Sequence, residues 1–326
     1  MASGWLSAGV AILVWGVTFA STRVLLEDFS ALEINIVRFA LAWAVLAVGG
    51  MLRCARCARP TDAGRRSLGD RPTNGAVAPQ WMFAAMGFTG VFAYQFLENC
   101  AIYYTNASNV AILVSFGPVV TAVMARLIAN DRSLSLRLVC GSVVAVAGVA
   151  LVALNGVVNF EMRPLGDLMA CCAMASWGLY SVLVEKANRL GVRPLLAVRR
   201  SFAWALLMML PLAAWGTSES GYVALDGSYS ITLDADANAE RFASLLNWAN
   251  MAFLGVLASA ACFVLWSRAC RLLGVVRTTV GLYLTPLVGV VFAVLFLKER
   301  LTWLSVVGGM LILCGVCVAN AKWREQ

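Results

Sequence analysis

The chain has 326 residues, of which 61% are apolar and only 13% are charged, and its mean hydropathy is +0.81. Soluble domains are nearer half apolar and a quarter charged, so this composition excludes an ordinary water-soluble core. A net charge of +8 would suggest nucleic-acid binding in a soluble protein, but here the basic residues lie between apolar blocks. In that position they indicate orientation in a membrane, and we expect no nucleic-acid partner.

Nearly uncharged blocks of about 18–22 residues recur along the chain, which is the length a helix needs to cross a bilayer core of about 30 Å. The blocks are apolar on all faces, unlike the alternating segments of a β-barrel. We therefore predict an all-α membrane protein of ten transmembrane helices with the lipid bilayer as its surroundings. In chain order the predicted spans are 5–23, 33–51, 80–98, 103–125, 136–155, 165–184, 195–215, 246–267, 275–297 and 302–320.

Two connections between the spans are long and carry opposite charge. Residues 53–79 hold six arginines, whereas residues 217–245 hold five carboxylates and one arginine. Apart from Arg38, 19 basic residues fall in or near the connections on the side of the N-terminus and five on the other side. The positive-inside rule then predicts a bacterial-type inner membrane protein with both termini in the cytoplasm. Within the outer connection, an Asp-Gly turn leaves two alternatives for 222–231, a small hairpin lid or a solvated loop.

The second half of the chain repeats features of the first in the same order. Two features recur at an offset of 162 residues, three at an offset of 168 and one at an offset of 167. We therefore predict two five-helix units, 1–155 and 156–326, and an odd number of spans inverts the second unit in the membrane. Inverted units can exchange conformations and so open a central site to alternate sides. The matched pairs are Trp15/Trp177 and Arg38/Arg200, then Ala101/Ala269 and Pro118/Pro286, followed by Asp131-Arg132/Glu299-Arg300 and the Gly-x6-Gly segments Gly141–Gly148/Gly308–Gly315.

These features resemble the EamA family of the drug/metabolite transporter superfamily. The resemblance rests on Trp15-Gly16, on Arg38-Phe39-Ala40, on the run from Ala101 through Tyr104, Ala107 and Val110 to Pro118, and on residues 297–301. The family pattern has a proline six residues before the second-span arginine. Pro194 fits this pattern in the second half, whereas Leu32 occupies the equivalent position in the first half. The resemblance implies ten helices, cytoplasmic termini, a central cavity and export of amino acids or related metabolites.

Two ionisable side chains within or at the end of a span are candidate functional residues. Arg38 lies about seven residues into its span, where a charge costs about 2.5–3.5 kcal/mol. It contacts either the substrate or a structural partner such as Glu98. Glu98, with Asn99 beside it, ends the third span. It is either a proton-coupling carboxylate or a helix-end carboxylate that meets water.

Other candidates are prolines with nearby polar residues, and mid-span aromatic residues. Pro118 and Pro286 interrupt the fourth and ninth spans and remove a backbone donor, either for packing or to line a wet cavity. The aromatic residues either pack the core or stack on an organic substrate or a cationic amine. Together the predicted substrate-binding residues are Trp15, Arg38, Glu98, Asn99, Asn109, Ser115, Pro118, Trp177, Tyr180, Trp266, Tyr283 and Pro286, with Thr285 also near a kink.

We expect a secondary transporter that exports amino acids or similar small polar metabolites by alternating access, with a proton or cation as the candidate coupling ion. The chain has no histidine and no Gly-rich phosphate loop with Lys, so we expect no enzyme activity, cofactor or metal site. The alternatives are a non-transporting membrane sensor or assembly protein on the same fold, and a transporter of nucleotide sugars or lipid-linked amines. Gly49-Gly50 and the Gly-rich fifth and tenth spans pack either within one chain or between two in a homodimer.

Overall fold

A computed structural model describes residues 2–57, 78–105, 107–129, 134–154, 163–216, 239, 241–296 and 302–321. These residues are helical almost throughout, and no strand occurs among them. Eight of the described helices are long and apolar enough to cross a membrane, and Ala2–Thr18 forms a shorter apolar helix. The all-α membrane class predicted from composition is therefore confirmed. The hairpin considered for 222–231 lies outside the described residues, as do 58–77 of the basic connection.

The first half of the chain is helical in each of the five ranges where the sequence predicts a span. Its third predicted span contains a π-helical stretch, and its fourth is divided into two helices. The elements are α1 (Ala2–Leu25), α2 (Ala31–Cys57), α3 (Gln80–Gly87), η2 (Phe88–Ala93), α4 (Tyr94–Tyr104), α5 (Ala107–Val114), α6 (Gly117–Ala129) and α7 (Leu136–Leu154).

The second half has the same sequence of features. A π-helical stretch again lies within its third predicted span, and a 3₁₀ stretch divides its fourth. The elements are α8 (Pro164–Arg189), α9 (Pro194–Gly216), α11 (Leu245–Ala252), η4 (Phe253–Ala261), α12 (Cys262–Leu273), α13 (Val275–Val280), η5 (Gly281–Leu284), α14 (Thr285–Phe296) and α15 (Trp303–Asn320).

Helix boundaries differ from the predicted spans where polar residues prolong a helix. The sequence predicts a span at 165–184, whereas α8 continues to Arg189. Glu185 and Arg189 lie one turn apart and form an ion pair at 2.5 Å along the helix surface. Such i,i+4 pairs stabilise a helix beyond its apolar block, so the helix ends several residues after the block does.

Both prolines predicted to interrupt spans do mark interruptions. Ser115 and Phe116 separate α5 from α6, immediately before Pro118. The 3₁₀ turn η5 precedes Pro286 at the start of α14. The π-helical stretches η2 and η4 were not predicted, because each contains a single glycine and no proline, a pattern that an ordinary membrane-spanning α-helix also has.

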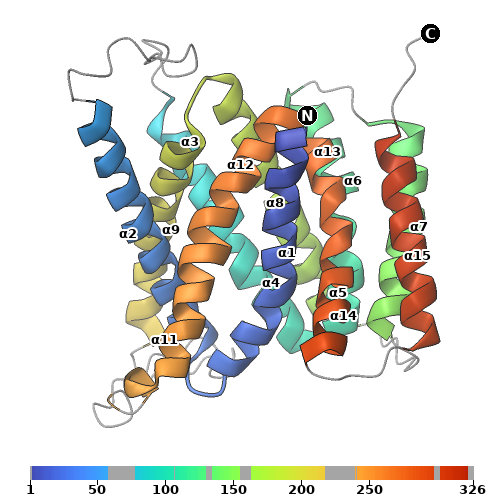
Figure 1. Ribbon diagram of the computed structural model, residues 1–326, viewed down its shortest axis with the longest axis horizontal. Coiled ribbons are helices and arrows are strands. Elements are labelled where there is room, and N and C mark those ends of the chain that lie inside the picture. The colour runs from blue at the N-terminus through green and yellow to red at the C-terminus, as the bar shows by residue number, and fades with distance from the viewer. Residues whose placement is uncertain are drawn as a thin grey trace.

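The helices pack so that each half contacts the other (Figure 1). Helix α1 packs against α12 and α14 of the second half, and α8 packs against α4 and α6 of the first half. Helix α2 contacts α9 and η4, while α9 contacts α3 and η2. The α1–α2 connection and the beginning of α11 lie at the end of the bundle opposite the N-terminus (Figure 1). We call this the mouth end, and the end where α1 begins the base end.

Helices α7 and α15 form a pair at one edge of the bundle (Figure 1). A Cβ added at Gly148 would lie 2.5 Å from the Gly308 carbonyl oxygen, and one at Gly315 would lie 2.5 Å from the Gly141 carbonyl oxygen. Only glycine allows this approach, because the opposing atoms belong to the backbone and cannot rotate away. The two Gly-x6-Gly segments therefore pack against each other within one chain.

We predict that Gly148→Ala lowers the free energy of unfolding by about 1–3 kcal/mol, because its Cβ forces α7 and α15 apart. The measurement is thermal unfolding of the purified protein in detergent. Gly9→Ala in α1 is the control, since an added Cβ there meets nothing within 4 Å. Equal stability of the two variants would contradict this account of the helix pair.

Candidate functional site

A cavity of about 770 Å³ lies at the centre of the bundle. Residues of α1, α2, α4, α8 and α12 line it, together with both interrupted helical spans, α5–α6 and α13–α14. It extends to the mouth end, since Thr22, Leu26 and Ala31 line it and Leu26 is 51% exposed. The two helix interruptions thus lie beside the cavity, where the freed backbone groups are not exposed to lipid.

Most of the predicted substrate-binding residues lie at this cavity, although nothing bound identifies a contact with a substrate. Tyr180 and Trp266 do not line it and are fully buried in the core next to it. Asn99 and Asn109 lie in described helices, but their side chains are outside the part of the chain that the structure describes. The predicted residues that line the cavity are Trp15, Arg38, Glu98, Ser115, Pro118, Trp177, Tyr283 and Pro286.

An aromatic cluster closes the cavity toward the base end. The ring centroids of Trp15 and Trp177 are 6.0 Å apart with their planes nearly perpendicular, and Trp15 lies 5.2 Å from Trp266. Phe263 completes the cluster, 5.8 Å from Trp15. The Trp15 indole N–H donates to the carbonyl oxygen of Ala258 in η4 at 2.9 Å. The aromatic floor is therefore held by edge-to-face packing and one hydrogen bond to the π-helical backbone.

Arg38 provides a positive charge at the cavity wall. Its Nε donates to Ser259 Oγ of η4 at 2.6 Å, and its guanidinium carbon lies 5.2 Å from the Phe39 ring centroid. The two terminal nitrogens form no hydrogen bond with any described residue, and both are accessible from the cavity. Ser259 therefore orients the guanidinium and leaves its terminal N–H groups available for a ligand.

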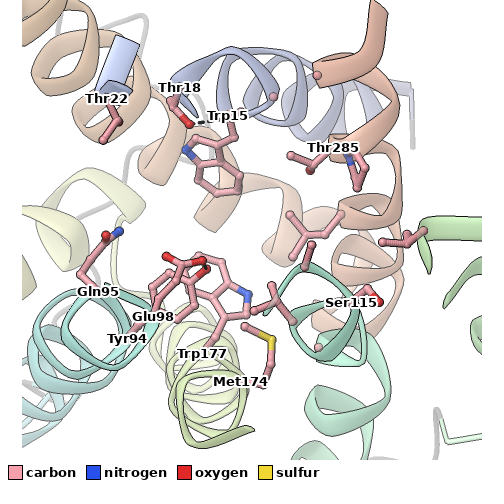
Figure 2. A pocket seen from close by; sticks show the side chains of 18 of the residues that line it. Trp15, Thr18, Thr22, Tyr94, Gln95, Glu98, Ser115, Met174, Trp177 and Thr285 are labelled. Atoms are coloured by element: carbon pink, nitrogen blue, oxygen red, sulfur yellow. Dashed lines mark hydrogen bonds between the residues drawn. The ribbon is translucent and has the colours of Figure 1, made fainter. Parts of the chain in front are cut away.

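Glu98 provides a negative charge in the same cavity. Tyr94 donates its hydroxyl proton to Glu98 Oε1 at 2.8 Å, so one carboxylate oxygen is fixed by its own helix. Figure 2 shows the carboxylate directed into the cavity, across from Trp15. Arg38 and Glu98 attract each other electrostatically, but no direct ion pair joins them in the described part of the chain. The structural pair considered from the sequence is therefore not a direct contact.

Several cavity residues were not predicted, although helical periodicity would have found most of them. Thr18 and Thr22 follow Trp15 by one and two turns on α1 (Figure 2). Asn35 precedes Arg38 by one turn on α2, and Gln95 precedes Glu98 by one turn on α4. Residues three or four positions apart share a helix face, so each predicted residue indicates its neighbours.

The mouth end contains a buried ion pair. Arg241, just before α11, forms bonds of 2.8 and 3.0 Å to the two carboxylate oxygens of Glu33 and donates to the Asp28 carbonyl oxygen. Each charged side chain of the pair is only 9% exposed. Glu33 also accepts from the Ser30 backbone N–H at 2.9 Å while Ser30 Oγ accepts from Glu33 N–H, a capping box that begins α2. The pair fixes the end of the acidic connection to the α1–α2 turn.

These observations define a multi-pass helical membrane protein with a charged and aromatic cavity that is open at one end and closed at the other, the architecture of a membrane transporter. The chain belongs to the EamA-like transporter family, whose sequence model matches residues 2–154 and 164–321.

Several bacterial and archaeal transporters are similar to this chain over nearly its whole length. A probable terminal-alkyne amino-acid exporter of Streptantibioticus cattleyicolor is 28% identical, covering 95% of this chain and 91% of the relative. A probable amino-acid metabolite efflux pump of Escherichia coli K12 is 23% identical, covering 96% and 94%. A solved crystal structure with 18% identity has the same fold, with a TM-score of 0.68 over 98% of this chain and 97% of that one.

We predict that Arg241→Met lowers the free energy of unfolding by about 3–5 kcal/mol, because it breaks the buried ion pair with Glu33 and removes both of its hydrogen bonds. Urea or thermal unfolding in detergent measures the loss. Arg271→Met, at an exposed arginine of α12, should change stability by less than about 0.5 kcal/mol. The double variant Glu33→Gln/Arg241→Met should recover part of the loss. No recovery would mean that the arginine acts through packing rather than charge.

Proposed function

We propose that the chain is a secondary transporter that exports amino acids or similar small polar metabolites by alternating access. One observation carries the proposal: the cavity presents a cation and an anion, each with unused hydrogen-bonding atoms, above an aromatic floor. A guanidinium with free terminal N–H groups matches a carboxylate. A carboxylate in a cavity that two indole rings also line matches an ammonium group through both ionic and cation–π attraction. Arg38 and Glu98 thus complement the two charges of a zwitterion.

The remaining cavity wall fits a small substrate of mixed polarity. A volume of about 770 Å³ lies within the ~300–1,000 Å³ range of small-molecule sites. Asn35 and Gln95 add amide groups, whereas Trp15, Trp177 and Phe263 supply an apolar surface. This division favours a molecule with charged groups at one end and an apolar or weakly polar side chain at the other. The printed descriptions of the relatives from S. cattleyicolor and E. coli support the same substrate class.

Ten membrane-spanning helices in two inverted five-helix units, 1–155 and 156–326, are part of the proposal. The two matched segments of the family model, one in each half, support it. The helix contacts support it as well, because contacts of one half have counterparts in the other. The contact of α1 with α12 corresponds to that of α8 with α4, and the contact of α1 with α14 to that of α8 with α6. Both π-helical stretches occupy equivalent places in the two halves. Gly255 in η4 lies against the backbone of α2, which carries Arg38, and Gly87 just before η2 lies against the backbone of α9, which carries Arg200.

The orientation that we propose places both termini and the base end in the cytoplasm, with the mouth end outside the cell. The charge asymmetry of the connections supports it. A C-terminal epitope tag should then be digested by protease in inside-out vesicles and protected in intact spheroplasts. The reverse pattern would overturn the orientation without affecting the transport proposal.

We propose further that transport is coupled to a proton or another cation, for which Glu98 is the candidate carboxylate. It is the acidic side chain that lines the cavity, among the residues the structure describes. Its fixed oxygen faces Tyr94 and its other oxygen is available to a cation. Substrate flux driven by an imposed pH gradient, compared with flux without one, tests the coupling.

We predict that Arg38→Ala and Glu98→Gln each raise the apparent KM for a transported amino acid by about 10- to 100-fold. Each variant removes a charge-assisted contact worth about 1.5–3 kcal/mol. The measurement is saturable counterflow of radiolabelled amino acids in proteoliposomes. The Arg38 variant should stop distinguishing an amino acid from its methyl ester, and the Glu98 variant should stop distinguishing it from its N-acetyl derivative.

Two matched variants control for charge removal alone. Arg271→Ala and Glu27→Gln change exposed charges that do not line the cavity, and both should keep wild-type KM values. If folded wild-type protein transports no member of a broad amino-acid and metabolite panel, the proposed function is wrong. If flux persists unchanged in both cavity variants, transport stands but the assigned site does not.

A further inference from the structure

Among the buried polar side chains without a hydrogen-bond partner in the described part of the chain, three lie outside the cavity in residues that are 0% exposed. They are the hydroxyl groups of Thr121 and Tyr180 and the indole N–H of Trp266. Buried polar groups without partners are rare in folded proteins and call for a specific explanation. In a membrane a missing hydrogen bond costs still more free energy, because lipid supplies no alternative partner. These groups are therefore poorly matched to the conformation in which they are found.

The positions of the three residues are related to the cavity by the sequence repeat. At the offset of 162 residues that joins Trp15 to Trp177, Tyr180 corresponds to Thr18. At the offset of 168 residues that joins Pro118 to Pro286, Trp266 corresponds to Glu98 and Thr121 to Gly289. Thr18, Glu98 and Gly289 all line the cavity. Each of these three groups thus occupies the position that, in the other half of the chain, lines the open cavity.

The helices that carry these residues are in opposite states in the two halves. In Figure 2, Thr18 and Thr22 of α1 face Gln95 and Glu98 of α4 across the cavity. The corresponding helices of the second half, α8 and α12, are instead in contact. The Tyr180 and Phe263 ring centroids are 6.0 Å apart, and Asn188 donates to the Ser267 carbonyl oxygen at 3.0 Å. Exchange of the two arrangements would close α1 on α4 and separate α8 from α12.

We propose that Tyr180, Trp266 and Thr121 line the base-facing half of the transport pathway and donate hydrogen bonds to the substrate carboxylate there, with Arg200 as the cation. This inference rests on the proposed transport function. Arg200 is the counterpart of Arg38 and now lies with its guanidinium carbon 5.1 Å from the Phe83 ring centroid. A carboxylate that leaves Arg38 would then meet a second guanidinium with three neutral donors, so the same anionic group is recognised in both conformations.

A native cysteine reports on this second conformation. Cys262 corresponds to the cavity residue Tyr94 at the offset of 168 residues, and it is only 1% exposed. Its thiol should therefore be inaccessible in the present conformation and accessible from the base end after the exchange. Thr18→Cys supplies the opposite reporter, because Thr18 lines the cavity that opens at the mouth end.

The experiment applies a membrane-impermeant cationic methanethiosulfonate to one side of the full-length Thr18→Cys protein in oriented vesicles. Peptide mass spectrometry measures the modification of each thiol. Reagent at the base end should modify Cys262 over time, and the attached cation should hold α8 and α12 apart. Labelling of Thr18→Cys from the mouth end should then fall at least about tenfold. In protein that also carries Cys262→Ser, base-end reagent should leave that labelling unchanged.

The outcomes separate this inference from the proposed function and from unfolding. Local unfolding would raise labelling at both positions, whereas exchange raises one and lowers the other, so a joint rise overturns the inference. Amino-acid flux without any modification of Cys262 also overturns it, while the transport function stands. Reciprocal labelling without flux of any panel member supports the pathway and overturns the proposed substrate class.

Isosteric variants test the hydrogen-bonding role of the buried donors. Tyr180→Phe removes a hydroxyl that has no partner in the present conformation, so its thermal stability should equal or exceed that of the wild type. Its flux from the base side should show a KM raised several-fold. Unchanged KM, or a loss of stability without a change in KM, would assign the hydroxyl a structural role and overturn its place in the pathway.

Discussion

The hydrocarbon core of a membrane contains no water, and every polar group carried into it must therefore find a partner in the protein. Arg38 shows what this constraint demands. Its charge lies within the second helical span, and its Nε is satisfied by a hydroxyl of η4, 221 residues further along the chain. The same stretch supplies the Ala258 carbonyl oxygen that accepts from Trp15. A π-helical turn in a region of small residues therefore supplies both acceptors that position the cation and the aromatic floor of the cavity.

The two halves of the chain place different chemistry at equivalent positions. Gln95 and Glu98 of the first half correspond to Phe263 and Trp266 of the second, and Ser115 corresponds to Tyr283. The repeat thus supplies the same helix packing twice, but one half contributes polar side chains where the other contributes aromatic ones. A symmetric cavity would bind a symmetric molecule, whereas this arrangement suits a substrate with a charged end and an apolar end. In the proposed mechanism, specificity arises from the differences between the two units, and motion from their similarity.

Apolar block length and the interrupting prolines predicted the helices and their breaks well, because both are local properties of the sequence. The prediction of cavity residues was less complete. Trp15, Arg38, Glu98 and Trp177 were chosen for residue type and depth, and all four line the cavity. Tyr180 and Trp266 met the same criteria but lie behind the floor, because depth in a span does not indicate which helix face meets which neighbour. The π-helices and the Glu33–Arg241 pair depend on contacts between distant segments, which no local pattern reveals.

A transporter on this architecture must hold some contacts fixed while others exchange. The α7–α15 pair is suited to the first role, since its glycines bring two backbones together with no side chain that can rearrange. The interface between α8 and α12 is suited to the second, because it combines packed aromatic rings with polar groups that lack partners in the described part of the chain. Unpaired donors raise the free energy of the closed base relative to an arrangement in which they are solvated or bound. In the proposed mechanism, this cost keeps the closed base from being too stable to open, and the aromatic rings exclude water from it.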